Sequence, residues 1–212
     1  MWTSTELASE HRPYIGRVWR VVEAQHRIST NRLATNLDDQ HMLELLAEEV
    51  KPQIPESAKH LHFLLASPFR YGHRQASRFR CAGEKPGIFY ASEQESTAIA
   101  ETAYWRLRFF SRSPGFQPPS TTTEYTSFTV KLDASNAIDL TVAPFKASAE
   151  LWNDLTDYSA CQQLATAVRE CGTQLIRTMS VRDAALGCNI VVLDPSTFSE
   201  STPRTGNTWH MR

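Results

Sequence analysis

Apolar residues follow two kinds of pattern along the chain, and the first kind predicts strands. Residues 15–22 are rich in β-branched and aromatic side chains, which is typical of an opening strand. In residues 125–132 the apolar side chains of Phe128, Val130 and Leu132 alternate with polar ones, which predicts a half-buried strand. Shorter extended pieces are predicted at residues 137–140, 175–176 and 190–193.

The second pattern has helical spacing. In residues 36–50, Met42, Leu45 and Leu46 share one face of a predicted helix that Asp38 or Asp39 caps and that prolines 52 and 55 end. Residues 159–170 form a second predicted helix, which Gly172 ends in a left-handed conformation.

A strand followed directly by a helix is predicted in the middle of the chain. Residues 77–81 are short and extended, residues 83–87 form a turn, and residues 88–91 form a strand that ends at Ser92. Ser92 and Glu95 have the S-x-x-E spacing of a capping box, so the helix should begin there and continue to about Phe110. Residues 60–66 are apolar but fit either element, residues 67–75 are irregular, and residues 111–123 form a loop rich in Pro, Ser and Thr.

These elements mix strands and helices without a regular βαβ alternation, and 212 residues suit one domain better than two. We therefore expect an α+β fold in a single domain. The predicted domain spans residues 14–198, with poorly ordered termini at residues 1–13 and 199–212.

Composition excludes several kinds of function. A hydrophobic share of 41% and a charged share of 21% are those of a globular protein, and a net charge of −1 gives no reason to expect direct nucleic-acid binding. The four cysteines have no C-x-x-C spacing, and His60 and His62 lack a third ligand nearby, so no metal site is expected. No apolar run approaches the roughly 18 residues of a membrane span, and residues 1–12 lack the apolar region of a signal peptide, so we expect a cytoplasmic protein with no membrane partner.

Residues 77–101 (SRFRCAGEKPGIFYASEQESTAIAE) resemble the signature of the RES-domain family, which is named for its Arg, Glu and Ser. Two further segments resemble that family in the expected order, RVWRV at residues 17–21 and IRTMSVRDAALGCNIVVLDP at residues 176–195. The resemblance therefore covers residues 16–198. Two departures stand out. Ala-Ser-Arg-Phe-Arg at residues 76–80 replaces the Gly-Gly-Arg-Trp-Asn of many members, and the insert at residues 36–75 makes this a larger variant.

The resemblance implies an ADP-ribosyltransferase-like fold, with a mixed β-sheet core and flanking helices. It also implies a toxin that consumes NAD⁺ as its substrate, needs no separate cofactor and is held silent by a cognate antitoxin. Carried over by position, the motif assigns catalytic roles to Arg78, Tyr90, Glu101 and Ser180, and NAD⁺ binding to Arg78, Tyr90 and Arg20.

The residue types suit that chemistry. Cleavage of the N-glycosidic bond passes through a positively charged ribose centre, which a carboxylate such as Glu101 stabilises. The planar guanidinium groups of Arg78 and Arg20 suit the pyrophosphate, and Tyr90 offers an aromatic face and a hydroxyl. No His lies near Ser180 in the sequence to act as its base, so its expected role is a hydrogen bond to the ribose or carboxamide.

Each residue also has an ordinary structural interpretation. Glu101 can be a solvated helix residue, Tyr90 a core aromatic and Ser180 a turn residue. In an alternating strand, Arg78 and Arg80 would point together toward solvent. Arg17 and Arg20, three residues apart, would lie on opposite faces of their strand, so at most one of them lines a given pocket.

Three hypotheses of function stay open. The first is an NAD⁺ glycohydrolase or phosphorylase toxin; the second is a mono-ADP-ribosyltransferase that modifies a host protein; the third is a non-catalytic binding protein with a degenerate site. The absence of G-x-G-x-x-G, G-x-x-x-x-G-K-[ST] and G-x-S-x-G argues against a Rossmann dehydrogenase, a P-loop enzyme and an α/β-hydrolase. A homo- or hetero-oligomer is compatible with all three hypotheses.

Overall fold

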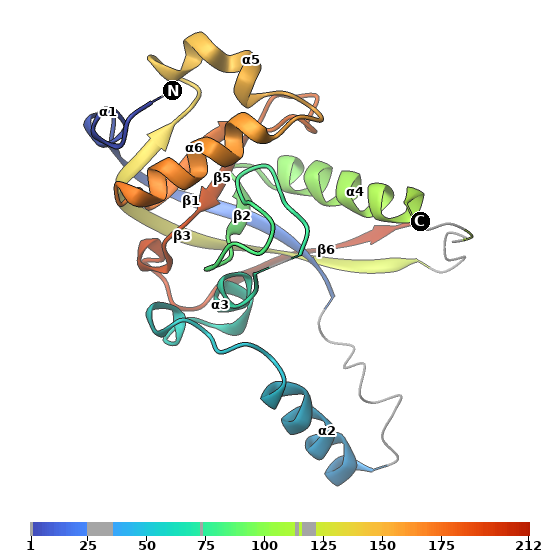
Figure 1. Ribbon diagram of the computed structural model, residues 1–212. Coiled ribbons are helices and arrows are strands. Elements are labelled where there is room, and N and C mark those ends of the chain that lie inside the picture. The colour runs from blue at the N-terminus through green and yellow to red at the C-terminus, as the bar shows by residue number, and fades with distance from the viewer. Residues whose placement is uncertain (1, 25–35, 73, 113–114, 116–121) are drawn as a thin grey trace.

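The alternating segments of the sequence become the strands of one mixed β-sheet in the computed structural model (Figure 1). The residues that the structure describes are 2–24, 36–72, 74–112, 115 and 122–212. The strands are β1 (Arg12–Glu23), β2 (Phe89–Ser92), β3 (Thr123–Asp139), β4 (Leu175–Met179), β5 (Cys188–Val192) and β6 (Arg204–Met211). The prediction of a single α+β domain is confirmed.

The sheet closes on itself. Its strand order is β1-β2-β5-β4-β3-β6, and β1 also pairs with β3, so the first five strands form a ring and β6 lies outside it. Among the strands that the structure describes, β3 and β4 are the one parallel pair, and the other pairs are antiparallel. Because β1 and β2 meet at a single residue pair, Trp19 with Ser92, the ring is loosely joined on the side where the helix after β2 packs.

β3 is longer than its sequence pattern predicts. The pieces predicted at residues 125–132 and 137–140 join into one strand of 17 residues. It pairs with β1 from Tyr125 to Ala137, with β6 along its first part and with β4 at its end. Because β3 pairs with different strands along its length, its two apolar segments belong to one continuous strand with no turn between them.

Helices cover both faces of the sheet. The helices of the described residues are α1 (Ser4–Ser9), α2 (Leu37–Glu49), α3 (Phe63–Arg70), α4 (Glu95–Ser111), α5 (Ala149–Trp152) and α6 (Ser159–Glu170), with 3₁₀ turns at Glu56–Ala58, Phe145–Ser148 and Pro195–Thr197, and all but α2 pack against the sheet or its neighbouring elements. Neighbouring strand residues enter separate cores, so Ile190 packs toward α3 whereas Val191 packs toward α5 and α6. In Figure 1, α2 stands apart from both layers, and its residues Met42, Leu45 and Leu46 are exposed.

Two predicted helix caps are wrong. α4 begins at Glu95 after Gln94, which makes no capping bond through its side chain. Ser92 is still the last residue of β2, and its hydroxyl donates to Asn189 Oδ1 at 2.7 Å instead of to a backbone amide of the helix. α2 is capped by Asn36, whose Oδ1 accepts from the backbone amide of Asp39 at 2.8 Å, and neither Asp38 nor Asp39 is the cap.

The ambiguous run at residues 60–66 resolves into α3, which extends beyond it through part of the stretch predicted to be irregular. Leu65 and Phe69, four residues apart, are 0% and 1% exposed, so burial on the sheet holds this helix despite Pro68 within it. Most of the loop predicted at residues 111–123 lies outside the described residues.

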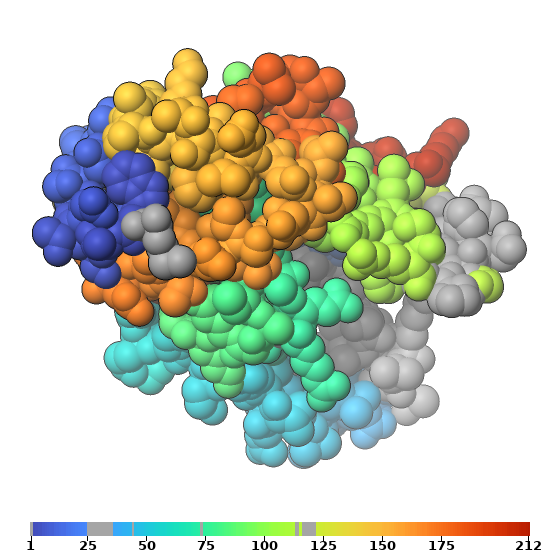
Figure 2. Space-filling model, turned by 45° about the horizontal axis from the view of Figure 1, so that its top comes forward, coloured from blue at the N-terminus to red at the C-terminus, as the bar shows by residue number. Residues whose placement is uncertain are grey.

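Both ends of the chain are folded where the sequence predicts poor order. At the N-terminus, Thr3 and Glu6 form a capping box on α1, and Leu7 is fully buried. In the space-filling view, the blue residues of this end lie against the gold and orange residues of α5 and α6 (Figure 2). At the C-terminus, β6 pairs with β3, and the Glu95 carboxylate accepts from the Trp209 indole at 3.0 Å.

Within the described ranges, no helix is long and apolar enough to cross a membrane.

Candidate active site

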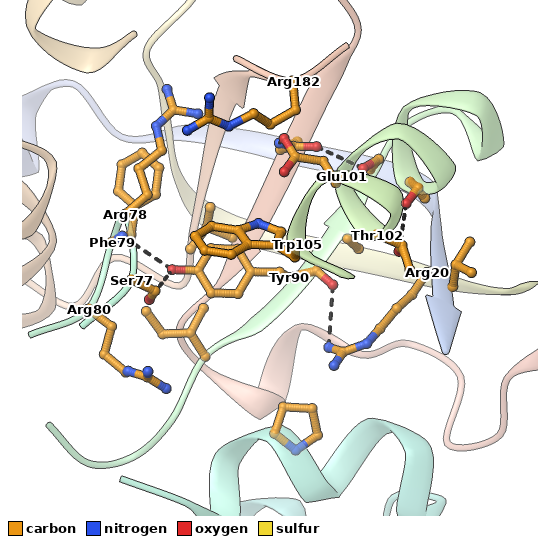
Figure 3. A pocket seen from close by; sticks show the side chains of 18 of the residues that line it. Arg20, Ser77, Arg78, Phe79, Arg80, Tyr90, Glu101, Thr102, Trp105 and Arg182 are labelled. Atoms are coloured by element: carbon orange, nitrogen blue, oxygen red, sulfur yellow. Dashed lines mark hydrogen bonds between the residues drawn. The ribbon is translucent and has the colours of Figure 1, made fainter. Parts of the chain in front are cut away.

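A cavity of about 710 Å³ opens among β1, β2, α4 and the segments around residues 75–80 and 178–182 (Figure 3). Four of the five site residues expected from the sequence line it, and they are Arg20, Arg78, Tyr90 and Glu101. The fifth, Ser180, lies directly behind Glu101 and bonds to its carboxylate. The chain thus brings together residues that are up to 160 positions apart in the sequence.

The Glu101 carboxylate is held on one oxygen. Its Oε1 accepts from Ser180 Oγ and from Asn189 Nδ2, each at 2.6 Å. In the described part of the chain, Oε2 has no hydrogen-bond partner, so it is available to a ligand in the cavity. Two neutral donors orient this carboxylate without cancelling its charge.

Ser180, expected from the sequence to bond the ribose or carboxamide, has hydrogen-bond partners inside the protein. Its side chain is buried, its hydroxyl donates to Glu101, and its oxygen accepts from the backbone amides of Arg182 and Asp183, each at 3.2 Å. These three bonds engage the hydroxyl fully. The bond from Ser180 to Oε1 holds the Glu101 carboxylate in place.

Asp183 ties the loop that carries Ser180 to the first turn of α4. Its carboxylate accepts from Thr97 Oγ1 at 2.7 Å and from the amides of Ala185 and Gly187 at 2.9 and 3.3 Å. These bonds, that from Thr97 first, hold the pKa of Asp183 below its ordinary value. A Cβ at Gly187 would overlap the Thr97 hydroxyl, so the glycine is what permits this close approach.

Asn189 is a site residue that the sequence did not reveal. It lies on β5 beside β2, where its Oδ1 accepts from Ser92 and its Nδ2 donates to Glu101. The only signal in the sequence was a polar residue next to the apolar run at residues 190–193, which does not tell a site residue from a solvated strand end.

Arg78 is a buried cation without a carboxylate partner. It is 7% exposed, and its guanidinium donates to the carbonyl of Trp152 at 3.1 Å and to that of Met179 at 2.8 Å. The side-chain oxygens of Asn153 and Thr178 accept from Nη2 at 3.2 and 3.1 Å. All of these acceptors are neutral, so the positive charge is oriented but not compensated within the described residues.

Tyr90 fixes the turn that carries Arg78. Its hydroxyl accepts from the amide of Phe79 at 3.2 Å and shares a 2.8 Å hydrogen bond with Ser77 Oγ. Burial raises the pKa of Tyr90, so its phenol stays neutral at ordinary pH. Ser77 and Arg80 pair with each other as the ends of a turn, which corrects the prediction that residues 77–81 are extended.

The turn also overturns the expectation that Arg78 and Arg80 point together toward solvent. Both are buried, at 7% and 6% exposed. In Figure 3, Arg78 lies on the same side of Tyr90 as Glu101, and Arg80 lies on the other side. Arg80 donates to the carbonyl of Gln75 at 2.8 Å.

Arg20, Arg106 and Arg182 also line the cavity. Arg20 donates to the carbonyl of Tyr90 at 3.3 Å and stacks over the Phe89 ring, and burial lowers its pKa to about 10. Arg17 bonds Glu200 away from the cavity, so only one of this pair lines it, as their spacing predicts. Arg182 donates to Tyr158 Oη at 2.7 Å and stacks over the Tyr104 ring.

The cavity favours an anion. Arginines lining it outnumber carboxylates, and of the lining carboxylates Glu23 is already paired with Arg106 at 3.3 Å. Among the described residues, no group of three or more His, Cys, Asp or Glu side chains could hold a metal ion. The arrangement suits an anionic ligand whose reacting centre develops positive charge near Glu101.

Comparison with known proteins identifies the family. A family model described as RES domain matches residues 54–212, three quarters of the chain, and the chain belongs to that family. The matched region contains Arg78, Tyr90, Glu101 and Ser180, and Arg20 and α2 precede it. It also begins later and ends later than the segment 16–198 in which the sequence resembles the family.

Among solved structures, the chain is similar to one from the crystal structure of the M. tuberculosis MbcT-MbcA toxin–antitoxin complex, with a TM-score of 0.54 and 12% sequence identity over 98% of this chain and 91% of that one. A comparison with curated proteins gave no match. The likeness is one of fold, because so low an identity leaves the chemistry to the site itself.

Proposed function

We propose that this chain cleaves the nicotinamide–ribose bond of NAD⁺, with water or phosphate as the acceptor. The observation that carries the proposal is the Glu101 carboxylate, which Ser180 and Asn189 orient at the wall of a cavity that also holds the uncompensated guanidinium of Arg78. A fixed carboxylate stabilises a ribose cation, and an uncompensated arginine binds a pyrophosphate. The cavity volume of about 710 Å³ falls within the range of small-molecule sites, roughly 300 to 1,000 Å³.

The proposed reaction needs only groups that this chain supplies. In this proposal Arg78 and Arg20 bind the pyrophosphate and the Tyr90 ring contacts the nicotinamide; all three residues line the cavity. The glycosidic bond breaks with its electron pair on the nicotinamide nitrogen, which leaves as neutral nicotinamide. Glu101 stabilises the cation at the ribose carbon until an oxygen of the acceptor bonds to it, and when water is the acceptor, its proton passes to Glu101.

We propose the biological role of a toxin that an antitoxin partner neutralises. Membership of the RES family and the likeness to a chain of a toxin–antitoxin complex support this role. An enzyme that consumes NAD⁺ without restraint would stop its own cell from growing, so a partner that limits access to the cavity is a physical requirement of the proposal.

The experiment that tests the reaction compares wild type with Glu101→Gln on purified protein. NAD⁺ and its products are separated by chromatography and mass spectrometry. Wild type should release nicotinamide together with ADP-ribose or its 1″-phosphate, and Glu101→Gln should reduce kcat about 10²- to 10³-fold, as the loss of one transition-state stabilising group does. Glu170→Gln, at an exposed glutamate on α6, is the matched control and should keep full activity. Intact NAD⁺ after incubation with folded wild type contradicts the proposal.

Transfer of ADP-ribose to a protein is the second candidate, and the mouth of the cavity favours it. Trp105, on α4, lines the cavity and is 42% exposed, so an apolar surface borders the site where a protein acceptor would dock. Label from the adenylate part of NAD⁺ that stays in protein supports transfer; label in free ADP-ribose supports hydrolysis. If NAD⁺ binds but gives neither product, the chain is a non-catalytic binding protein.

A further inference from the structure

Arg80 is a buried cation that the proposed NAD⁺ chemistry does not use. It lines the cavity, is only 6% exposed and belongs to the turn that also carries Arg78. One hydrogen bond is recorded for its side chain, from Nη2 to the carbonyl of Gln75. Its Nε is buried and unpartnered, and none of the described carboxylates forms an ion pair with it.

A buried guanidinium with one neutral hydrogen-bond partner is stabilised by an anion. Removing a charge from water is costly unless an opposite charge or several hydrogen bonds replace the water, and Arg80 has one neutral acceptor. Arg106, in the same cavity, shows the alternative, because it is paired with Glu23. Arg169, which lies close to the Arg80 turn, is paired with Glu84 at 3.2 Å. Among the described residues, the Arg80 guanidinium therefore keeps N–H donors without an acceptor, at the wall of the cavity.

The position of Arg80 in the cavity indicates which anionic group of a bound dinucleotide it would contact. In Figure 3, Glu101, Arg78 and Arg182 lie on one side of Tyr90, and the guanidinium groups of Arg80 and Arg20 lie on the other side. With the nicotinamide ribose at Glu101 and the pyrophosphate between Arg78 and Arg20, the adenosine of a dinucleotide would extend toward Arg80. The 2′-hydroxyl of that adenosine is where NADP⁺ carries a phosphate and NAD⁺ does not.

We propose that Arg80 binds the 2′-phosphate of the adenosine ribose, so that the chain cleaves NADP⁺ in preference to NAD⁺. The inference rests on the proposed function and deepens it by naming the substrate class. An arginine that accommodates the 2′-phosphate is a general device for selecting NADP⁺ over NAD⁺.

The experiment measures kcat/KM for both dinucleotides with wild type, Arg80→Gln and Arg80→Lys. Wild type should prefer NADP⁺, and Arg80→Gln should lower the NADP⁺ to NAD⁺ ratio of kcat/KM about 10- to 100-fold, the range expected for hydrogen bonds to a charged group. Arg80→Lys keeps the charge but loses the fork, so its ratio should lie between the two. Arg74→Gln, which removes an exposed arginine just before the turn, should leave the ratio unchanged.

A binding measurement separates this inference from the proposed reaction. By calorimetry, 2′-AMP should bind wild type more tightly than 5′-AMP and lose that advantage in Arg80→Gln. If it does so although neither dinucleotide is cleaved, the subsite stands and the proposed reaction fails. If NAD⁺ is cleaved as well as NADP⁺ and Arg80→Gln leaves the ratio unchanged, the inference fails and the reaction stands. If Arg80→Gln instead raises KM for inorganic phosphate with the ratio unchanged, Arg80 serves the acceptor, and the inference is likewise overturned.

Discussion

Arg78 is buried and the side chain of Arg177 is 25% exposed, and the protein holds their charges in opposite ways. Arg177, on β4, donates to both carboxylate oxygens of Glu93 at 2.8 and 2.9 Å and forms a second ion pair with Asp139 at 3.2 Å. Arg78 donates only to neutral oxygens, chiefly the carbonyls of Trp152 and Met179. The hydrogen bonds and charge of Glu93 raise the pKa of Arg177, whereas nothing described neutralises Arg78.

The same contrast separates the carboxylates. Glu93, between β2 and α4, forms an ion pair with Arg177 on β4, and we expect this pair to stabilise the fold. Glu101 is held by a hydroxyl and an amide, so its charge stays available. Of these four groups, Arg177 and Glu93 pair with each other away from the cavity, whereas Arg78 and Glu101 have neutral partners and line it. This distinction between paired and unpaired charge can be tested at both places.

The largest effect is expected at Arg78. Arg78→Gln removes the uncompensated charge, so kcat/KM for the dinucleotide should fall roughly 100-fold, the cost of deleting one partner of a buried charge pair in the complex. Activity assays and calorimetry on the same protein would measure it. Unchanged affinity in a folded variant would mean that Arg78 serves only to hold the carbonyls of Trp152 and Met179 together.

Arg177→Gln should produce the opposite profile. It leaves Glu93 and Asp139 without their shared partner, so the free energy of unfolding should fall by about 2 kcal/mol. Urea denaturation would measure the loss. The kcat/KM of the folded variant should stay within about threefold of wild type, because Arg177 does not line the cavity. If Arg177→Gln lost activity but kept its stability, Arg177 would act like Arg78, and the contrast between a structural and a ligand-binding arginine would be wrong.

The motif positions put Tyr90 on a predicted strand and Glu101 on a predicted helix, and the structure has them on β2 and α4, where both line the cavity. Local geometry was harder to predict. The extended reading of residues 77–81 failed because the Tyr90 hydroxyl, held by Phe79 and Ser77, imposes a turn that no local pattern encodes.

The errors at the caps and at the C-terminus have a similar cause. Ser92 matches the capping spacing but bonds Asn189, a residue 97 positions away. The polar residues of β6 suggested poor order, yet β3 offers them a free edge, and the Glu95 carboxylate binds Asn207 and Trp209. In each case a tertiary partner decides the structure, and single-sequence patterns carry no information about distant partners.

A smaller effect is expected from the groups that orient Glu101. Ser180→Ala and Asn189→Ala each remove one donor to Oε1, so each should lower kcat about tenfold and leave KM nearly unchanged, because the carboxylate keeps its charge but loses its fixed position. Because both donors share one acceptor, their effects should not be independent. The loss of kcat in the double variant should therefore differ from the product of the two single losses. A change in KM alone would assign these residues to substrate binding instead.

The smallest effect concerns Arg20 and pH. Burial lowers the pKa of Arg20 to about 10, so the free protein loses this charge above that pH. A bound anion favours the charged form and raises the pKa again, so binding above pH 10 must take up a proton. The affinity for a dinucleotide should therefore fall roughly fourfold between pH 9 and pH 10.5, measured by calorimetry on protein shown to be folded by circular dichroism.

The stability of the free protein should change with pH in the direction opposite to the affinity, rising as Arg20 loses its charge. The unfolded chain holds this proton more tightly than the folded one, so the cost of burying the charge is present below about pH 10 and is relieved as the pH rises through that value. Arg20→Met should therefore bind more weakly, lose the pH dependence of binding and unfold at a higher temperature at pH 7. A variant that binds weakly and is also less stable would show that Arg20 supports the fold through Tyr90 and Phe89, and would place it with the paired arginines.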